Sequence, residues 1–222
     1  MQLTTLFLRI LTAASLTLCL VTTVQAAQPV AGKEYLVVKP PQPTDSGNKV
    51  EVLEFFWYGC PHCYSLQPSL EAWLKRKPAD VEFKRVPAVF QDSWVPLTRA
   101  YYTIEAMGLV DKLHQDMFAT LHKQRVRLQD ANAIFDWAAG KGVDRKKFAD
   151  TYNSFGVNSR TQRSVELTRK FDIPGTPALV IDGKFVAAPS LTLKSERVID
   201  YDRFFEVVDA LIADARKGKG GK

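Results

Sequence analysis

The sequence of 222 residues has few of the side chains on which metal and nucleic-acid sites depend. It contains 3 cysteines and 3 histidines, whereas a structural zinc site needs about four closely spaced nitrogen or sulfur ligands. Lys and Arg (30) outnumber Asp and Glu (24), for a net charge of +6, but they form no dense basic stripe with interleaved aromatic residues. We therefore expect no metal site and no nucleic-acid partner, and we identify no residues for any other cofactor.

The sequence also lacks an apolar run that suits a membrane span. The apolar segment Ile10–Val21 is short and rich in Thr and Ser. It follows a single charge at Arg9 and precedes the small residues around Ala26. This pattern is typical of a secretory signal peptide. We therefore predict that residues 1–26 are removed near Ala26, and that the mature chain is exported without stable membrane insertion.

Cleavage removes Cys19 and leaves two cysteines, Cys60 and Cys63, in an oxidising compartment. They lie at the predicted start of a helix that runs to about Lys77, one turn apart and close enough to bridge. Backbone N–H groups and the helix dipole stabilise a thiolate at Cys60. Pro61 suits the first helical turn, where no amide donor is needed. A hydrogen bond from His62 would stabilise the Cys60 thiolate further.

A stabilised thiolate makes the corresponding disulfide a strong oxidant. The spacing therefore predicts thiol–disulfide exchange, with Cys60 attacked first and Cys63 as the less exposed resolving thiol. A purely structural disulfide is the alternative, but one that closes a single turn constrains little. A zinc site is disfavoured because His114 and His122 have helical spacing, which favours a solvated helix face.

Two further positions are candidates for a functional role. Glu54 lies within the apolar run Val50–Trp57, where a buried carboxyl is costly unless it is paired or protonated. It is interpreted as a proton acceptor or relay beneath the cysteines, with Lys84 on the next strand as its partner, or else as a strand-edge residue that reaches solvent. Thr176-Pro177 precedes a strand and is either a cis bond that exposes a peptide-docking edge or an ordinary trans turn.

The order of elements predicts an α/β fold interrupted by helices. Strands are expected at 35–38, 50–57 and 81–86, and a hairpin at 178–186. Residues 91–169 have helical periodicity throughout, with the fourth helix carrying Phe148, Tyr152 and Phe155 and ending at Gly156. A final amphipathic helix begins near Tyr201. We expect two core parts, 27–90 and 170–222 with its basic tail, around the insertion 91–169.

Two segments, VLEFFWYGCPHCY at 52–64 and GTPALVIDGKF at 175–185, carry a family resemblance. Together with the signal peptide and the helical insertion, they resemble the DsbA-type periplasmic thiol:disulfide oxidases. The resemblance covers essentially the whole mature chain. It implies a thioredoxin fold with an inserted all-helical domain, and a monomer that oxidises unfolded exported proteins with free thiols. It also implies reoxidation by a DsbB-like, quinone-linked membrane protein.

By this resemblance, Cys60 and Cys63 form the redox-active disulfide, and Pro61 and His62 tune it. The resemblance also implies that Glu54 and Lys84 are the charged pair below the disulfide. It makes Thr176-Pro177 a cis-proline loop that faces the disulfide, where His62 and Pro177 border a substrate groove. Two residues depart from the family pattern: Thr176 stands where many relatives have Val, and Gln67 where some have Glu. Both departures concern the strength of oxidation.

Two other functions remain open from the sequence. A disulfide isomerase or reductase of the same compartment would use the same cysteines, but isomerases usually need a dimerisation segment, and none is evident before Val50. A chaperone-like binding module that keeps the motif as a relic would suppress aggregation without either cysteine.

Overall fold

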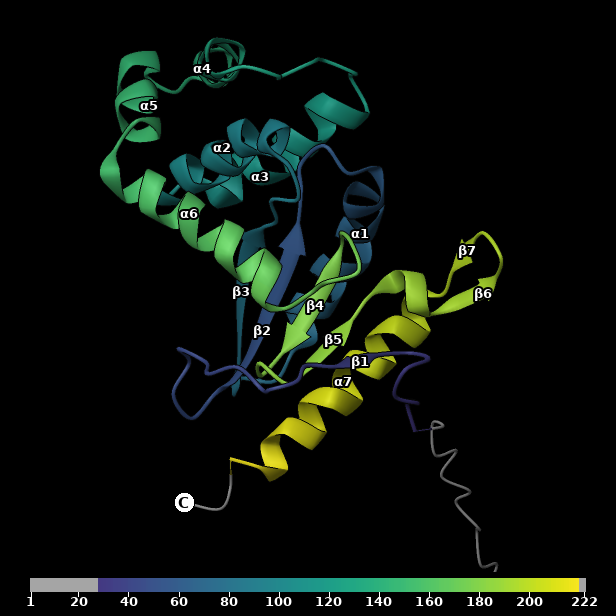
Figure 1. Ribbon diagram of the computed structural model, residues 1–222. Coiled ribbons are helices and arrows are strands. Elements are labelled where there is room, and N and C mark those ends of the chain that lie inside the picture. Colours follow the sequence, from purple (N-terminus) through teal and green to yellow (C-terminus); the bar gives the residue numbers. More distant parts are fainter. Residues whose placement is uncertain (1–27, 220–222) are drawn as a thin grey trace, which may run out of the picture.

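The computed structural model describes residues 28–219, so the predicted signal peptide, its cleavage site and Cys19 lie outside the described residues. A five-stranded mixed sheet forms the centre, in the order β1-β5-β4-β2-β3 (Figure 1). Strands β2 and β3 are parallel, and the other neighbouring pairs are antiparallel. The strands are β1 (Leu36–Val37), β2 (Val50–Phe56), β3 (Val81–Pro87), β4 (Ala178–Ile181) and β5 (Phe185–Ala187).

Strand β2 is buried along its whole length, as its nearly continuous apolar sequence predicts. Helices α1 (Pro61–Arg76) and α7 (Tyr201–Lys217) pack on the face that carries Val50 and Val52. The opposite face, with Leu53 and Phe55, packs against Phe171 and Ile173, which follow the last helix of the insertion. Because both faces of β2 are covered, its sequence is apolar on both sides and does not alternate between apolar and polar residues. Only Glu51 and Glu54 interrupt the apolar run.

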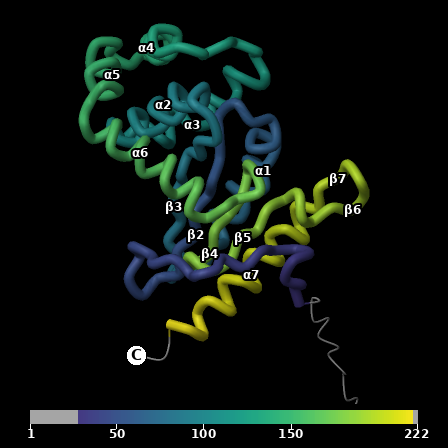
Figure 2. The backbone as a smooth tube through the Cα atoms, in the orientation of Figure 1, coloured from purple at the N-terminus to yellow at the C-terminus, as the bar shows by residue number. Residues whose placement is uncertain are grey.

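A block of helices joins β3 to β4 and lies at one end of the sheet (Figures 1 and 2). Its core continues into Phe56, Tyr58 and both cysteines, so the CPHC segment sits where the block meets the sheet. After the short 3-10 helix η1 (Asp92–Trp94), the helices are α2 (Val95–Ala106), α3 (Val110–His122), α4 (Ala131–Gly140), α5 (Arg145–Tyr152) and α6 (Phe155–Lys170).

Two elements differ from the sequence prediction. The fourth helix ends at Tyr152, and Gly156 lies in the first turn of α6 instead of ending a helix. Ser154 decides the boundary, because its side chain accepts a hydrogen bond from Val157 N as an N-cap, which leaves Phe155 exposed. The prediction also missed a small hairpin, β6 (Leu193–Ser195) and β7 (Val198–Ile199), which follows the 3-10 helix η2 (Pro189–Leu191). Its strands are too short to show a periodic pattern.

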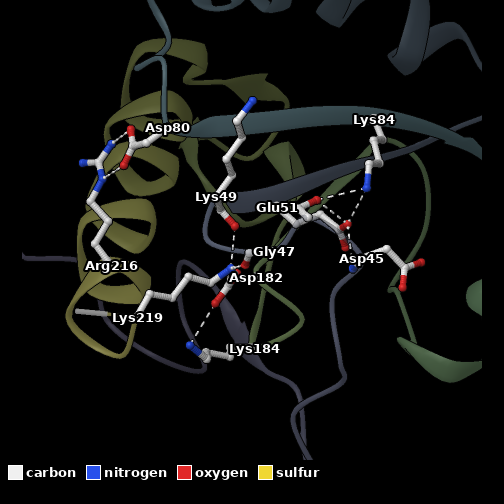
Figure 3. A network of polar contacts seen from close by, with 11 residues as sticks. Asp45, Gly47, Lys49, Glu51, Asp80, Lys84, Asp182, Lys184, Arg216 and Lys219 are labelled. Atoms are coloured by element: carbon white, nitrogen blue, oxygen red, sulfur yellow. Dashed lines mark hydrogen bonds and ion pairs between the residues drawn. The ribbon is translucent and has the colours of Figure 1, made fainter. Parts of the chain in front are cut away.

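A polar network ties the last described residues to the sheet at the start of β2 (Figure 3). Asp182 is buried and pairs with Lys184 at 2.9 Å and Lys219 at 2.7 Å. The Lys219 ammonium also donates to the carbonyl oxygens of Gly47 and Lys49. Lys219, within the basic tail, is therefore a structural tie between the end of α7 and the segment before β2.

The turn that carries Asp182 requires glycine at the next position. Gly183 has a φ of +65°, and a Cβ there would stand 2.1 Å from the carbonyl oxygen of Gln42. The same close approach lets Gln42 N donate to the Gly183 carbonyl at 2.9 Å. The Asp-Gly hairpin signal in the sequence is thus confirmed, and it also positions the carboxylate that Lys219 contacts.

Lys219→Ala should lower the free energy of unfolding by about 1–2 kcal/mol, because it removes one of two cations from a buried carboxylate. Lys217→Ala is the matched control, since Lys217 is exposed and its i,i+3 pair with Asp214 lies at the surface. The control should change stability by less than about 0.5 kcal/mol. Urea unfolding followed by circular dichroism measures both. Equal losses in the two variants would contradict a specific role for Lys219.

Candidate active site

The two cysteines lie on the first turn of α1, where the helix leaves the buried end of β2. Cys60 is the N-cap residue in extended conformation, and its sulfur accepts a hydrogen bond from Cys63 N at 3.4 Å. Pro61 occupies the first helical position, as expected. Cys60 is 9% exposed and Cys63 is fully buried, and both are free thiols in the structure. Only Cys60 can therefore meet a second sulfur from outside.

The surroundings shift the pKa values of the two thiols in opposite directions. A hydrogen bond from Cys63 is the main cause that lowers the pKa of Cys60 to about 5; burial opposes it, and Thr176 and the amides of Cys63 and His62 add to it. Burial, and then the neighbouring Cys60 sulfur, raise the pKa of Cys63 well above that of a free thiol. Cys60 is thus the leaving and attacking thiolate, and Cys63 is the sulfur that must exchange a proton.

His62 contributes to the thiolate in a different way from the one the sequence suggested. Its side chain is exposed, and among the described contacts no hydrogen bond joins the imidazole to Cys60. Its backbone N–H supplies the stabilisation. This is the usual contribution of an amide in the first turn of a helix, where N–H groups have no partner within the helix.

Thr176 and Pro177 lie against the cysteines, with the Thr176 carbonyl oxygen accepting from the Cys60 thiol at 3.3 Å. The peptide bond between them is cis, as the family resemblance predicts. Tertiary structure brings the segment there, because Ala178 begins β4, which pairs with β2 in the register Phe55 to Ala178. The loop before β4 therefore meets the loop after β2.

Glu54 is fully buried under α1, and its partner is Arg85 instead of Lys84. Arg85 Nε donates to Glu54 at 3.1 Å, and Gln67 Nε2 donates to the other carboxylate oxygen at 3.4 Å. Burial is the larger effect and raises the pKa of Glu54, which Arg85 partly offsets. The alternative of a solvent-reaching carboxyl is wrong, because β2 lies inside the sheet.

The expected pairing of Glu54 with Lys84 fails on register. Glu54 is opposite Arg85 in the parallel pair, so their side chains share the face beneath α1. Lys84 lies one residue earlier and points to the other face, where it binds Glu51 at 2.9 Å and Glu82 at 3.4 Å. Lys84 and Arg85 are adjacent cations, and only the strand register decides which of them lies on the same face as Glu54.

A chain of polar side chains links Cys63 to the surface through the buried acid. Gln67 Nε2 contacts both Glu54 and the Cys63 carbonyl oxygen, at 3.2 Å for the latter. Gln67 Oε1 accepts from Gln115 at 2.9 Å, and Arg85 also binds Glu71 at 3.1 Å. Nothing in the sequence points to Arg85, Glu71 or Gln115, because they come from three elements and share no motif.

Two histidines predicted on a solvated face lie against the turn that leads into Cys60. His114 is 2% exposed, and its Nδ1 lies 2.8 Å from the Tyr58 hydroxyl; burial lowers its pKa. His122 Nε2 contacts the Tyr58 carbonyl oxygen at 2.8 Å, and its ring stacks on Tyr64. The prediction was wrong because Phe118, midway between them, turns this helix face into the aromatic core.

A CPHC turn at a helix start, a cis-proline loop beside it and a mixed sheet beneath it define a thiol:disulfide oxidoreductase with a thioredoxin fold. The sequence model of the DSBA-like thioredoxin domain matches residues 51–198. The chain belongs to this DsbA family. Among the described residues no cluster of His, Cys, Asp or Glu could hold a metal ion, and no helix there is long and apolar enough to cross a membrane.

Curated relatives and solved structures agree with this assignment. The thiol:disulfide interchange protein DsbA of Bordetella parapertussis is 41% identical over 98% of this chain and 100% of its own length. The DsbA of Pseudomonas aeruginosa is 37% identical over 81% of this chain and 88% of its own. A crystal structure of Pseudomonas aeruginosa DsbA superposes with a TM-score of 0.78 at 34% identity, and covers 86% of this chain and 96% of that one.

The depressed pKa of Cys60 predicts a pH-dependent stability of the reduced protein. The pKa falls from an ordinary value of 9.0 to about 5 on folding, so the unfolded chain binds more protons between these two values. Compared with the disulfide form, the reduced form should therefore gain stability as pH rises from about 5 toward 9, and lose it as pH falls. Urea unfolding of both forms across this range measures the difference.

A pH titration of the thiolate, followed by ultraviolet absorbance, measures the pKa of Cys60 directly. The reduced protein should titrate with a midpoint near 5. Cys63→Ala should raise this midpoint by more than Cys63→Ser does, because serine keeps a donor to the Cys60 sulfur. A midpoint near 9 in the unaltered protein, or equal midpoints in the two variants, would contradict the account.

Proposed function

We propose that this oxidoreductase donates its Cys60–Cys63 disulfide to unfolded exported proteins in the periplasm, after residues 1–26 have been cleaved off near Ala26. The separation of the two thiol pKa values supports this direction most strongly, because the dithiol product is stabilised by a low-pKa thiolate at Cys60. Family membership and the signal-like segment at 1–26 support the location.

The reaction exchanges one disulfide for another. A substrate thiolate attacks Cys60 Sγ, the Cys60–Cys63 bond breaks, and Cys63 takes the electron pair and a proton. A second substrate thiolate then attacks the substrate sulfur of the mixed disulfide, and Cys60 leaves as a thiolate. The substrate loses two electrons and two thiol protons; one proton goes to Cys63 and the other to solvent, and the enzyme is left with a Cys63 thiol and a Cys60 thiolate. A DsbB-like membrane protein linked to quinone would accept those two electrons and restore the disulfide.

Glu54 is proposed as the group that exchanges the proton of Cys63. Its burial raises its pKa toward the range in which a carboxyl both accepts and releases a proton. Gln67 connects it to the Cys63 backbone, and Gln115 extends the connection outward. Arg85 keeps the carboxylate from becoming an unpaired buried charge, while Lys84 on the opposite face has no direct part.

An extended substrate segment is proposed to lie along the Thr176-Pro177 loop. The Thr176 carbonyl is within 3.3 Å of the Cys60 sulfur, so a chain beside this loop brings its own sulfur to Cys60. The pairing of β4 with its two neighbours begins only at Ala178 and Leu179, so the backbone of Thr176 and Pro177 lies before the paired part of the strand. His62 and Pro61 are exposed next to it and would contact the same segment.

The decisive experiment uses a reduced two-cysteine peptide and the oxidised protein. The unaltered protein should oxidise the peptide in one turnover, and Cys60→Ser, which has no disulfide to donate, should not react. Cys63→Ser loaded beforehand as a Cys60–glutathione mixed disulfide should release glutathione to a peptide with one cysteine and keep that peptide as a mixed disulfide at Cys60, all read by mass spectrometry. A scrambled disulfide protein offered to the reduced form is the comparison. Oxidation by Cys60→Ser, or reshuffling faster than oxidation, would overturn the donor function in favour of another activity or an isomerase.

The role of Glu54 is tested on the step in which Cys63 acts. Reduced protein mixed with oxidised glutathione first forms a mixed disulfide at Cys60, and Cys63 then displaces glutathione. Glu54→Gln should slow the second phase about tenfold at neutral pH and leave the first phase nearly unaffected, because only the second needs the Cys63 proton removed. Stopped-flow tryptophan fluorescence resolves the phases. Glu51→Gln on the other sheet face is the control, and an equal effect there would contradict the proposal.

A further inference from the structure

A cavity adjoins the cysteines on the side of the helical block. It has a volume of about 530 Å³ and reaches Gly59 and Pro61, the residues on either side of Cys60. Apart from Trp57, which follows β2, its remaining walls come from the block, chiefly from the start of α2 and from the segment between α3 and α4. The cavity therefore lies beside the reactive sulfur, and its lining includes neither Thr176 nor Pro177.

The apolar wall of this cavity is rigid where it meets the active site. The Trp57 indole covers Gly59 so closely that a Cβ on Gly59 would stand 2.3 Å from the ring. The same indole stacks on Trp94 with ring centroids 4.2 Å apart. Pro96, Leu97 and Leu128 complete the apolar lining, which suits a hydrophobic side chain of a bound polypeptide.

Two arginines at the rim give the cavity its charge. Arg125 and Arg127 are exposed, and neither has a hydrogen-bond or ion-pair partner among residues 28–219. No described carboxylate lines the cavity. Arg125 is held with a φ of 58°, and Val126 N donates to the Thr120 carbonyl at 3.0 Å, which anchors the segment to the end of α3. The two guanidinium groups therefore present an unneutralised positive rim.

We propose that this cavity holds part of the substrate polypeptide and selects segments with a carboxylate side chain close to the reactive cysteine. The inference rests on the proposed donor function and specifies its substrate class. Charge complementarity with Arg125 and Arg127 recognises the carboxylate, and the apolar wall accepts a neighbouring side chain. Because the lining includes Gly59 and Pro61, on either side of Cys60, the recognised carboxylate lies close in sequence to the substrate cysteine.

The test compares two reduced peptides that differ only by Glu or Gln three residues from a cysteine. Single-turnover oxidation by the oxidised protein at low ionic strength should be about threefold faster for the Glu peptide. High salt should remove most of this preference, because the rim charges are exposed. In Arg125→Gln/Arg127→Gln the ratio of the two rates should fall to about one.

A matched control separates the local rim from the net charge of the protein. Lys112→Gln/Lys147→Gln also removes two exposed cations without an ion-pair partner in the described chain, but from the outside of the helical block. It should keep the Glu preference. An equal loss in both double variants would show general attraction of anions to a basic protein and would overturn the proposal.

A charge exchange gives the sharpest form of the experiment. Arg125→Glu/Arg127→Glu should reverse the preference and oxidise a Lys peptide faster than the Glu peptide. A rate ratio near one in the unaltered protein would overturn this inference and leave the donor function standing. Failure to oxidise any of the peptides would instead overturn the donor function itself, so the two failures can be distinguished.

Discussion

The structure depends on one electrostatic constraint, which is that two sulfur atoms one helical turn apart are held at very different proton affinities. Cys60 sits at the open end of α1, where a thiol donor and unpaired amides favour its thiolate. Cys63 is enclosed by the core, where burial favours its thiol. Reduction of a disulfide between such a pair is favourable because it leaves Cys60 as a stabilised thiolate, so the position of Cys60 at a helix start makes the disulfide oxidising.

The sheet and the helical block are arranged to hold that helix start. Strand β2 delivers Cys60 to the edge of the core, and β4 returns to place Thr176 against it. In α3, His114 contacts the Tyr58 hydroxyl and His122 contacts the Tyr58 carbonyl oxygen. The insertion therefore fixes the turn that precedes Cys60. The same insertion leaves a cavity with a positive rim next to Pro61.

Much of this could be predicted from the sequence, because the signals are local. The VEVLEFFW strand, the helix start at Pro61, the Asp182-Gly183 hairpin and the amphipathic α7 all depend on near neighbours. Glu54 could be recognised as an anomaly, since one acid within an apolar strand is visible without coordinates. Its partner could not, because strand register alone decides whether Lys84 or Arg85 faces it. His114 and His122 were misplaced for a similar reason, since a helix face becomes core only when another element covers it.

By itself, the sequence determined the chemistry: two thiols in a helix-initiating turn, a buried acid on the preceding strand and a proline before the returning strand. These features are set by spacings of a few residues, over which backbone geometry leaves little choice. Tertiary structure alone decided the geometry between elements, including the cis-proline loop at Cys60, the Arg85–Glu54–Gln67 connection and the arginine rim at 125–127. The first two join residues from separate helices, strands and loops, and the third lies beside the active site only because the helical block packs against the end of the sheet.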